Sequence, residues 1–171
     1  MGRVVWINGS FSAGKTSVAK ALVEELDHSF LLDPELIGVV LRDHLVPPSL
    51  YHGDFQDLAL WRSLTRDVVL DAALRDNGVI VVPMTVARSD YFDEIIGAIR
   101  ERVRVHHFTL MASREEILRR ETRRADDTDA WAAKTVDRVL PELASSRYAE
   151  HLHTEGHTVP QIVAQIRSRI A

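Results

Sequence analysis

The sequence predicts an α/β fold: a three-layer sandwich in which helices cover both faces of an open, parallel, five-stranded sheet. Short runs of apolar residues, typical of strands buried on both faces, alternate with segments whose apolar residues recur every three or four positions, as in helices. Strands that alternate with helices favour a parallel sheet joined by right-handed crossovers. The 171 residues fit a single domain, 1–171, and no repeat or low-complexity linker divides them.

Five apolar runs are predicted to be strands. They span residues 4–7, 30–32, 79–82, 103–110 and 151–154. Between and after these runs, the apolar spacing predicts helices. The helices cover residues 17–26, 34–41, 54–77, 89–100, a stretch that begins at 113, 131–140 and 159–170.

Local signals mark several ends of these elements. Pro34 suits the first turn of a helix, and Gly78 suits the left-handed cap that ends one. Ser113 and Glu116 have the spacing of a capping box, in which each side chain bonds to the other residue's free backbone amide. Pro141 is expected to end the helix that precedes it, because proline cannot continue the hydrogen-bond pattern.

Charge and composition exclude several classes of function. The formal net charge is −4 and the sequence pI is about 6.0, so the chain has no overall attraction to nucleic acid or to an anionic membrane. It has no cysteine, which excludes disulfides and zinc–thiolate sites. No apolar run reaches the roughly 20 residues of a membrane helix, and the N-terminus lacks the pattern of a signal peptide. We therefore expect a cytoplasmic protein with no membrane span and no nucleic-acid partner.

A phosphate-binding motif follows the first predicted strand. Residues 9–16 match GxxxxGK[ST], in which glycines let successive amide N–H groups point at phosphate oxygens while the following helix adds its positive end. Lys15 is expected to reach the β- and γ-phosphates, and the Thr16 hydroxyl to ligate Mg²⁺. A glycine turn that only joins strand to helix is the alternative. The residues expected to hold the nucleotide are Gly9, Ser10, Phe11, Ser12, Ala13, Gly14, Lys15, Thr16 and Ser17.

The motif leaves the reaction open, because GTPases, motor ATPases and small kinases share it. The strand predicted at 79–82 lacks the aspartate that ends a conventional Walker B strand. Asp33 follows the second predicted strand, and ligands collect at the carboxyl ends of strands in an open α/β sheet. We therefore expect Asp33 to be a general base or an indirect Mg²⁺ partner. The alternative is that it only caps the helix that begins at Pro34.

The connection over residues 34–78 is longer than a crossover requires, and we expect it to hold the acceptor of the reaction. Trp61 could stack on a flat group, while Arg62 and Arg66 could hold anionic or polar groups. The alternative is that the aromatic residue belongs to the core and the arginines are solvated.

A group of arginines predicts a mobile lid over residues 119–131. Arg119, Arg120, Arg123 and Arg124 follow the capping box and precede a polar, acidic stretch. Arg120 and Arg124 are four positions apart, share one face of a helix and could stabilise charge on the transferring phosphate. The alternative is that they are ordinary surface arginines.

The histidines give weaker signals. His106 and His107 are neighbours on a predicted strand and face opposite ways, so we expect them to pack rather than to form one site. His151 and His153 share a face and could hold a metal ion, but the sequence offers no third ligand nearby.

Seven segments between Trp6 and Lys134 resemble a known family. They are WINGSFSAGKT, DPELIG, DFQDLALWR, VPMT, YFDEIIG, VHHFTLMAS and WAAK. On these segments the chain resembles the tunicamycin resistance proteins, which are ATP-binding members of the P-loop kinase superfamily. That wider group includes nucleoside monophosphate kinases, shikimate kinase and chloramphenicol phosphotransferase. The resemblance implies a P-loop kinase-like fold with ATP on residues 9–16, Asp33 facing the acceptor, and the arginines of 119–124 in the lid.

The resemblance also implies protection against tunicamycin, a uridine-containing nucleoside antibiotic with free hydroxyl groups. We expect a kinase that uses ATP and Mg²⁺ to phosphorylate a hydroxyl of tunicamycin or of a related nucleoside-like small molecule. Its expected catalytic residues are Lys15, Asp33, Arg120 and Arg124. Two alternatives are a protein that binds ATP and sequesters the drug unmodified, and a nucleoside or nucleotide kinase.

Overall fold

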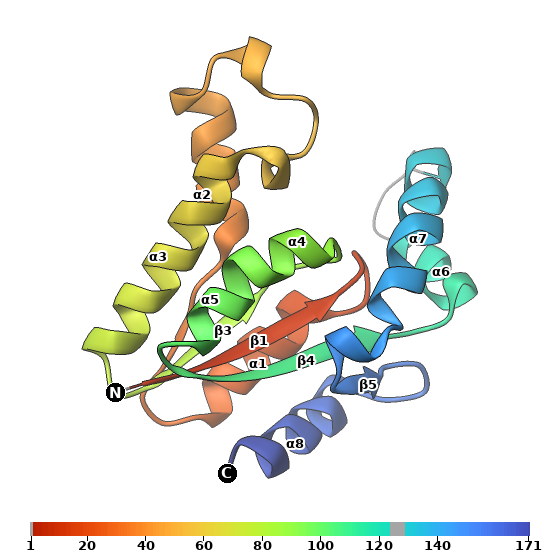
Figure 1. The fold of residues 1–171 in the computed structure, drawn as a ribbon. Helices are drawn as coiled ribbons and strands as arrows, with labels where there is room; N and C mark the ends of the chain where they lie inside the picture. The colour runs from red at the N-terminus through yellow and green to blue at the C-terminus, as the bar shows by residue number, and fades with distance from the viewer. Residues whose placement is uncertain (1, 124–128) are drawn as a thin grey trace.

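Five parallel strands form one sheet in the order β2-β3-β1-β4-β5, which confirms the predicted fold class (Figure 1). The computed structural model describes residues 2–123 and 129–171. The strands are β1 (Arg3–Gly9), β2 (Ser29–Leu31), β3 (Val79–Pro83), β4 (Arg104–Met111) and β5 (His151–His153). In the central strand β1, Arg3 pairs with Val79 on one side and with Arg104 on the other. Because the strands are parallel, their carboxyl ends lie at one edge of the sheet.

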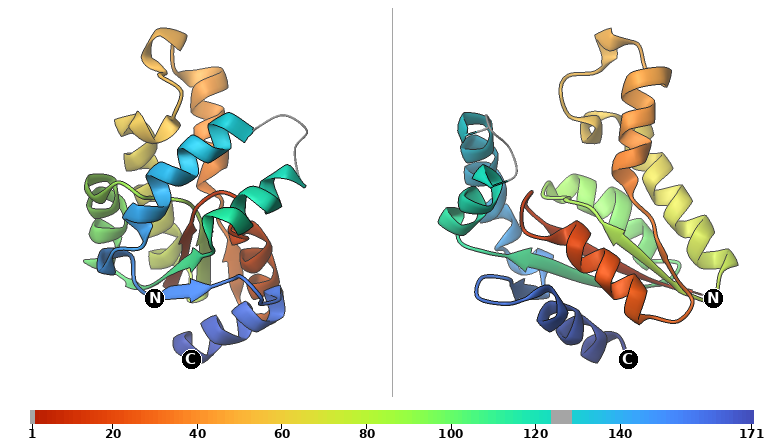
Figure 2. Two further views of the ribbon diagram at one scale, coloured as in Figure 1. Left: turned by 90° about the vertical axis from the view of Figure 1, so that its right-hand side faces the viewer. Right: turned by 180° about the vertical axis from the view of Figure 1, so that it is seen from behind.

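Two helices cover one face of the sheet (Figure 2). They are α1 (Lys15–Glu25) and α8 (Val159–Ile170), and the second has the predicted bounds. Val5 and Ile7 of β1 pack in one core with Leu22 of α1 and Ile166 of α8, all fully buried. None of the helices in the described part of the chain combines the length and apolar character that a membrane span requires.

The other face is covered by α3 and by a second helical segment. The bounds are α3 (Ala59–Arg75), then α4 (Ser89–Phe92), the π-helical turn η4 (Asp93–Gly97) and α5 (Ala98–Arg100), which follow one another without a break. Val4 and Trp6 of β1 pack here with Val69 and Ile96. The apolar run at 4–7 therefore supplies both cores in alternation, as expected of a strand buried on both faces.

Between β2 and α3 the chain forms an arm that projects beyond the sheet (Figure 1). The arm comprises α2 (Pro34–Val40), the π-helical turn η1 (Leu41–Leu45) and the 3-10 turns η2 (Pro48–Leu50) and η3 (Phe55–Asp57). The helix predicted from residue 54 begins only at Ala59, because the Asp54 carboxylate accepts a hydrogen bond from Gln56 N at 2.9 Å and starts η3 instead. Gly38 lets α2 approach η3 closely, since a Cβ there would lie 2.5 Å from the Phe55 ring.

A helical pair follows β4 and consists of α6 (Arg114–Thr122) and α7 (Asp129–Leu143). The second helix, predicted to stop near Pro141, continues to Leu143, so Pro141 lies inside its last turn. A proline in the last turn removes only one backbone bond, and Leu143 beyond it is fully buried. The last helical turn before β5 is η5 (Ser146–Tyr148).

The predicted capping box at the start of α6 is only half formed. Ser113 Oγ accepts a hydrogen bond from Glu116 N at 3.2 Å, as expected. The Glu116 carboxylate does not return the bond. It accepts hydrogen bonds from Arg119 and Arg120 at 2.8 Å and 2.7 Å, and the Ser113 N–H donates to the Glu155 carboxylate at 3.1 Å instead. Charged donors compete successfully with a neutral backbone amide.

His107 of β4 is a buried titratable group with 5% of its surface exposed. Its ring meets Phe92 edge-on at a centroid distance of 5.1 Å, which agrees with the predicted packing role. Nδ1 lies 3.1 Å from the Ala149 carbonyl oxygen, and Nε2 lies 3.3 Å from Asn8 Nδ2. Burial lowers the pKa of His107 to about 4.

We expect the free energy of unfolding to decrease as the pH falls from about 6.5, the pKa of an unfolded histidine, towards about 4, the pKa of folded His107. In this window the unfolded chain binds a proton that the folded chain does not. The nearby charges of Arg100 and His151 favour neutral His107 as well. Between pH 7 and pH 5 the loss due to His107 is about 2 kcal/mol.

Urea unfolding at several pH values measures this loss. The variant His107→Gln should show a shallower dependence on pH than the wild type, whereas the exposed control His52→Gln should not. An unchanged dependence in His107→Gln would contradict the assignment.

Candidate functional site

The loop between β1 and α1 has a backbone that curls around the start of the helix. Gly9, Ser12 and Gly14 have positive φ angles of 140°, 52° and 100°. A Cβ at Gly9 would also lie 2.8 Å from the Leu110 carbonyl oxygen, so only glycine fits there. The first turn of α1 contains no acidic residue that would weaken the positive end of the helix. The loop and the helix together form the anion-binding geometry that the motif predicts.

Lys15 and Thr16 begin α1 at the mouth of this loop. Lys15 Nζ donates a hydrogen bond of 2.9 Å to the Ser10 carbonyl oxygen, so its ammonium group lies across the loop. Ala13 N donates to the same oxygen at 3.3 Å. The side chains of Thr16 and Ser17 are exposed on the first turn, where hydroxyl oxygens suit Mg²⁺.

A cavity of about 440 Å³ opens beside the phosphate loop, between α1, α6 and the segment that follows β5. This volume is typical of a small-molecule site. One wall is formed by residues 12–18, and the other residues come from distant parts of the chain. Those residues are Arg120, Arg123, Thr154, His157, Val159 and Ile162. Sequence reasoning missed the last four, because no local pattern marks the segment after β5 as part of a site.

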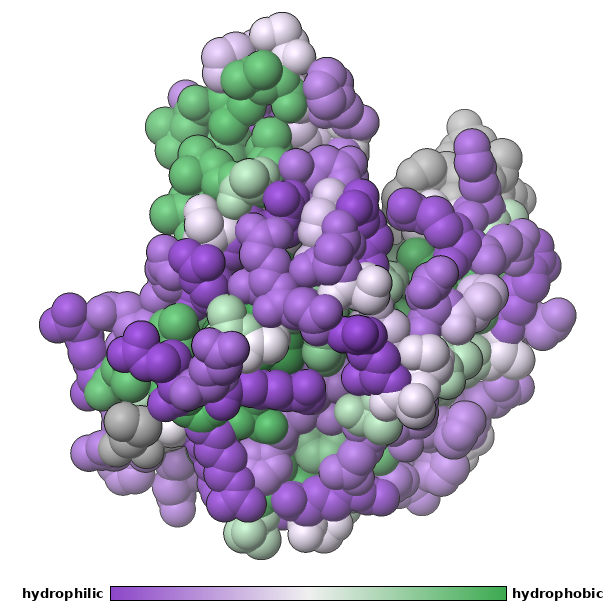
Figure 3. Space-filling view, in the orientation of Figure 1, coloured by the Kyte–Doolittle hydropathy of each residue, from purple (hydrophilic) through white to green (hydrophobic). Residues whose placement is uncertain are grey.

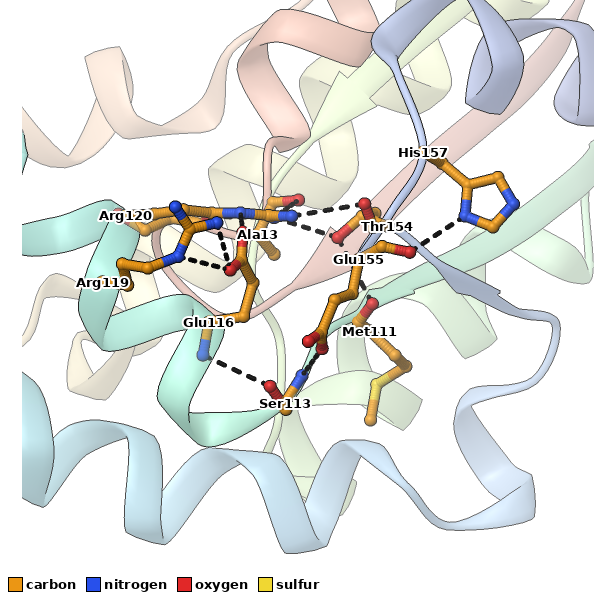
Figure 4. A network of polar contacts seen from close by, with 10 residues as sticks. Ala13, Met111, Ser113, Glu116, Arg119, Arg120, Thr154, Glu155 and His157 are labelled. Carbon is orange, nitrogen blue, oxygen red and sulfur yellow. Dashed lines mark hydrogen bonds and ion pairs between the residues drawn. The ribbon is translucent and has the colours of Figure 1, made fainter.

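Arg120 crosses from α6 to the segment after β5 and forms one wall of the cavity (Figure 4). Its guanidinium donates to Thr154 Oγ1 at 3.0 Å and to the Thr154 carbonyl oxygen at 3.2 Å. Glu116 accepts a further bond from Arg120 at 2.7 Å. Hydrogen bonds from Arg119 and Arg120 lower the pKa of the Glu116 carboxyl group. Glu116 therefore holds Arg120 in the extended position that reaches the cavity.

The other arginines of the predicted lid lie in different places. Arg123 lines the cavity with Arg120, whereas Arg119 is held by Glu116. Arg124 and residues 124–128 of the predicted lid lie outside the described part of the chain.

Two further contacts join α6 and α7 to the phosphate loop. Ser12 Oγ donates a hydrogen bond to the Glu121 carboxylate. Phe11 packs against a small core that contains Ile117 of α6 and Val136 of α7. Nothing in the sequence pattern pointed to Glu121, because its partner lies far away along the chain. The shape of the loop and the position of the helical pair therefore depend on each other.

Asp33 lies where the sequence placed it, just beyond β2 at the carboxyl edge of the sheet. The bond from Leu32 N to the Val81 carbonyl oxygen, 2.9 Å long, keeps this segment beside β3. Asp33 Oδ1 accepts a hydrogen bond from Glu35 N at 3.0 Å and caps α2. The side chain is partly exposed, so the cap occupies Asp33 without removing it from solvent.

The three predicted acceptor-binding side chains are placed differently. Trp61 has no exposed surface, and its Nε1 donates to the Pro34 carbonyl oxygen at 3.0 Å, so it belongs to the core and cannot contact an acceptor. Arg62 is held by Glu94 at 2.6 Å, and its guanidinium also stacks over a tyrosine ring. Arg66 pairs with the neighbouring Asp67 at 2.7 Å and is partly exposed. The structure does not bring these three together in one pocket.

Comparisons with known proteins extend this description. A family model described as an AAA domain matches residues 4–149. The tunicamycin resistance protein of Deinococcus radiodurans is 31% identical, with a TM-score of 0.85, over 100% of this chain and 96% of that one. A sugar kinase from Janibacter is 17% identical, with a TM-score of 0.67, over 98% and 94% of the two chains. The APS kinase of Mycobacterium tuberculosis in complex with AMPPNP and APS is 16% identical, with a TM-score of 0.66, over 98% and 96%. No curated protein sequence matches the chain.

The two kinases are too distant in sequence to indicate more than the shared fold. The family model, in contrast, spans most of this chain. The Deinococcus protein and this chain match each other almost from end to end. Both findings agree with the resemblance visible in the sequence segments. The chain therefore belongs to the AAA domain family and, within it, to the tunicamycin resistance proteins.

Proposed function

We propose that the protein is an ATP-dependent phosphotransferase that moves the γ-phosphate to a hydroxyl group of tunicamycin or of a related nucleoside-like molecule. The observation that carries the proposal is the phosphate loop with its adjoining cavity. Loop amides, the Lys15 ammonium group and the positive end of α1 suit a polyphosphate, and the cavity suits the nucleoside attached to it. The relative from Deinococcus carries tunicamycin resistance in its name, and the fold relative from Mycobacterium was solved with an ATP analogue.

The cavity suggests how ATP would lie. The phosphates would follow residues 13–16 beside Arg120, and the base would extend towards His157. Val159 and Ile162 offer the base apolar contact. Arg120 would exchange part of its bonding to Thr154 for contacts with the nucleotide.

Hydroxyl oxygens are the hard ligands that Mg²⁺ prefers, and Thr16 presents one on the first turn of α1. When bound there with ATP, Mg²⁺ would neutralise charge on the β- and γ-phosphates. Arg120 and Arg123, two arginines of the predicted lid, line the cavity. They would stabilise the negative charge on the same phosphates.

Asp33 would act as the general base. As the acceptor oxygen forms its bond to the γ-phosphorus, the bond from phosphorus to the bridging oxygen breaks and ADP leaves with that electron pair. The acceptor proton passes to the Asp33 carboxylate. Its position at the carboxyl edge of the sheet, at the base of the arm, supports this role, because ligands of open α/β folds collect at that edge.

Replacement of Lys15 by methionine should weaken ATP binding by about tenfold or more, because a charge-assisted contact to phosphate is lost. Calorimetric titration of ATP with Mg²⁺ measures the effect. Lys20→Met is the matched control, since Lys20 is exposed on the same helix away from the loop. Equal affinities in the two variants would contradict the role of Lys15.

Mass spectrometry of tunicamycin incubated with enzyme, ATP and Mg²⁺ should show one added phosphate. Asp33→Asn should lower kcat by roughly 100-fold, the usual contribution of a general base. Asparagine still caps a helix, so the variant should keep its fold. Asp76→Asn is a close control, because Asp76 Oδ1 accepts the same kind of bond from Gly78 N at 2.6 Å, at the amino ends of the strands, and its replacement should leave kcat unchanged.

Recovery of the drug unmodified, together with tight binding, would replace the proposal with ATP-dependent sequestration. Transfer to simple nucleosides in preference to the drug would instead indicate a nucleoside kinase.

A further inference from the structure

Asn8, the residue before the phosphate loop, uses every hydrogen-bonding position of its buried side chain. The residue has no exposed surface. Oδ1 accepts hydrogen bonds from Gly9 N at 2.8 Å and from Val86 N at 3.0 Å. Nδ2 donates to the Val86 carbonyl oxygen at 2.9 Å and lies 3.3 Å from His107 Nε2. A primary amide has two donors and two acceptor positions, so none is left over.

These partners fix the orientation of the amide and the tautomer of the histidine. If Asn8 were flipped, its NH2 group would face two N–H donors and its oxygen would face a carbonyl. His107 Nδ1 carries the proton that the Ala149 carbonyl accepts, which leaves Nε2 free to accept from Asn8. The burial that keeps His107 neutral also keeps this acceptor available.

Asn8 is one of several links between β1 and the segment after β3. Trp6 Nε1 donates to the Met84 carbonyl oxygen at 3.0 Å, and Met84 N donates to the Ile7 carbonyl oxygen at 3.1 Å. Thr85 Oγ1 donates to the Gly9 carbonyl oxygen at 2.6 Å. The backbone of Gly9 is therefore held at two points: its N–H bonds to Asn8, and its carbonyl oxygen bonds to Thr85.

The segment over residues 84–88 leads in turn to the arm. Arg88 stacks over the Tyr91 ring at 4.0 Å, and the Tyr91 hydroxyl donates to Asp57 Oδ1 at 2.7 Å. Arg62 covers the same ring at 4.2 Å. Asp57 belongs to η3, so a continuous set of contacts runs from the phosphate loop through Asn8 and residues 84–88 to the arm.

We infer that Asn8 is a positioning residue that fixes the acceptor side of the site relative to the phosphate loop. This inference rests on the proposed phosphotransfer, in which the acceptor oxygen must approach the γ-phosphorus closely and in line. Asn8 touches neither ATP nor acceptor. It holds Gly9 N–H away from the phosphates and holds residues 84–88 at a set distance from the loop.

The variant Asn8→Asp tests the inference with almost no change in shape. The carboxylate can still accept from Gly9 N and Val86 N, but it cannot donate, and it repels the Val86 carbonyl oxygen. We expect kcat to fall about tenfold or more while the Kd for ATP stays within about threefold, because the amides of residues 10–16 are untouched. Repulsion of the Val86 carbonyl should move residues 84–88 away from β1, so amide hydrogen exchange at Met84, whose N–H bonds to the Ile7 carbonyl oxygen, should become about tenfold faster.

Asn77→Asp makes the same chemical change just before β3, at the amino ends of the strands, and is the matched control. Thr85→Val is a second variant for the case in which Asn8→Asp does not fold. It removes one hydroxyl bond to Gly9 with little change in volume, and it should lower kcat in the same selective way.

The outcomes separate the inference from the function on which it rests. A Met84 exchange rate equal to that of Asn77→Asp overturns the inference, and so does a parallel loss of ATP affinity and kcat, which indicates a merely structural role. If the wild type transfers no phosphate, the proposed function fails, and the exchange rate still decides whether Asn8 holds residues 84–88.

Discussion

The whole site depends on the burial of β1 between β3 and β4, with helices on both of its faces. This strand cannot move sideways, so its last residue, Gly9, delivers the phosphate loop to a fixed place at the carboxyl edge of the sheet. Polar groups from other segments gather around it. Thr85, after β3, bonds to Gly9, and Glu121 of α6 accepts a hydrogen bond from Ser12. Thr154, after β5, lines the same cavity, and Asp33, after β2, lies at the same carboxyl edge of the sheet. An apolar strand with little chemistry of its own thus sets the geometry of polar groups from four segments. The space-filling view shows how the arm and the helical pair rise on either side of a hollow (Figure 3).

The sequence was sufficient for the fold because its signals were local. Apolar runs at 4–7 and 79–82 marked strands buried on both faces, and the periodicity at 159–170 marked α8 to the residue. Errors arose where a tertiary contact overrode a local preference. Buried Leu143 carried α7 past Pro141, the arginines took the Glu116 carboxylate away from its capping bond, and Asp54 started a separate short turn.

The site was predicted less completely, since much of it is assembled from distant parts of the chain. The phosphate loop could be read directly because a motif specifies its backbone. Glu121 and His157 could not, because Glu121 bonds to Ser12 and His157 shares a cavity with residues 12–18, more than a hundred residues earlier in the sequence. Trp61 shows the opposite case, in which a residue type suited to stacking is needed by the core instead. Asn8 escaped notice since a single buried amide leaves no periodic or compositional pattern.

The central claim is that the curled loop and the adjoining cavity bind a nucleoside triphosphate together. Amide chemical shifts recorded during titration with ADP and Mg²⁺ test it most directly. The account predicts large shifts for residues 13–17, 120 and 154–157, and little change at Gly9, whose N–H is already bonded to Asn8. Shifts confined to other surfaces, or no saturable shift at all, would contradict the account.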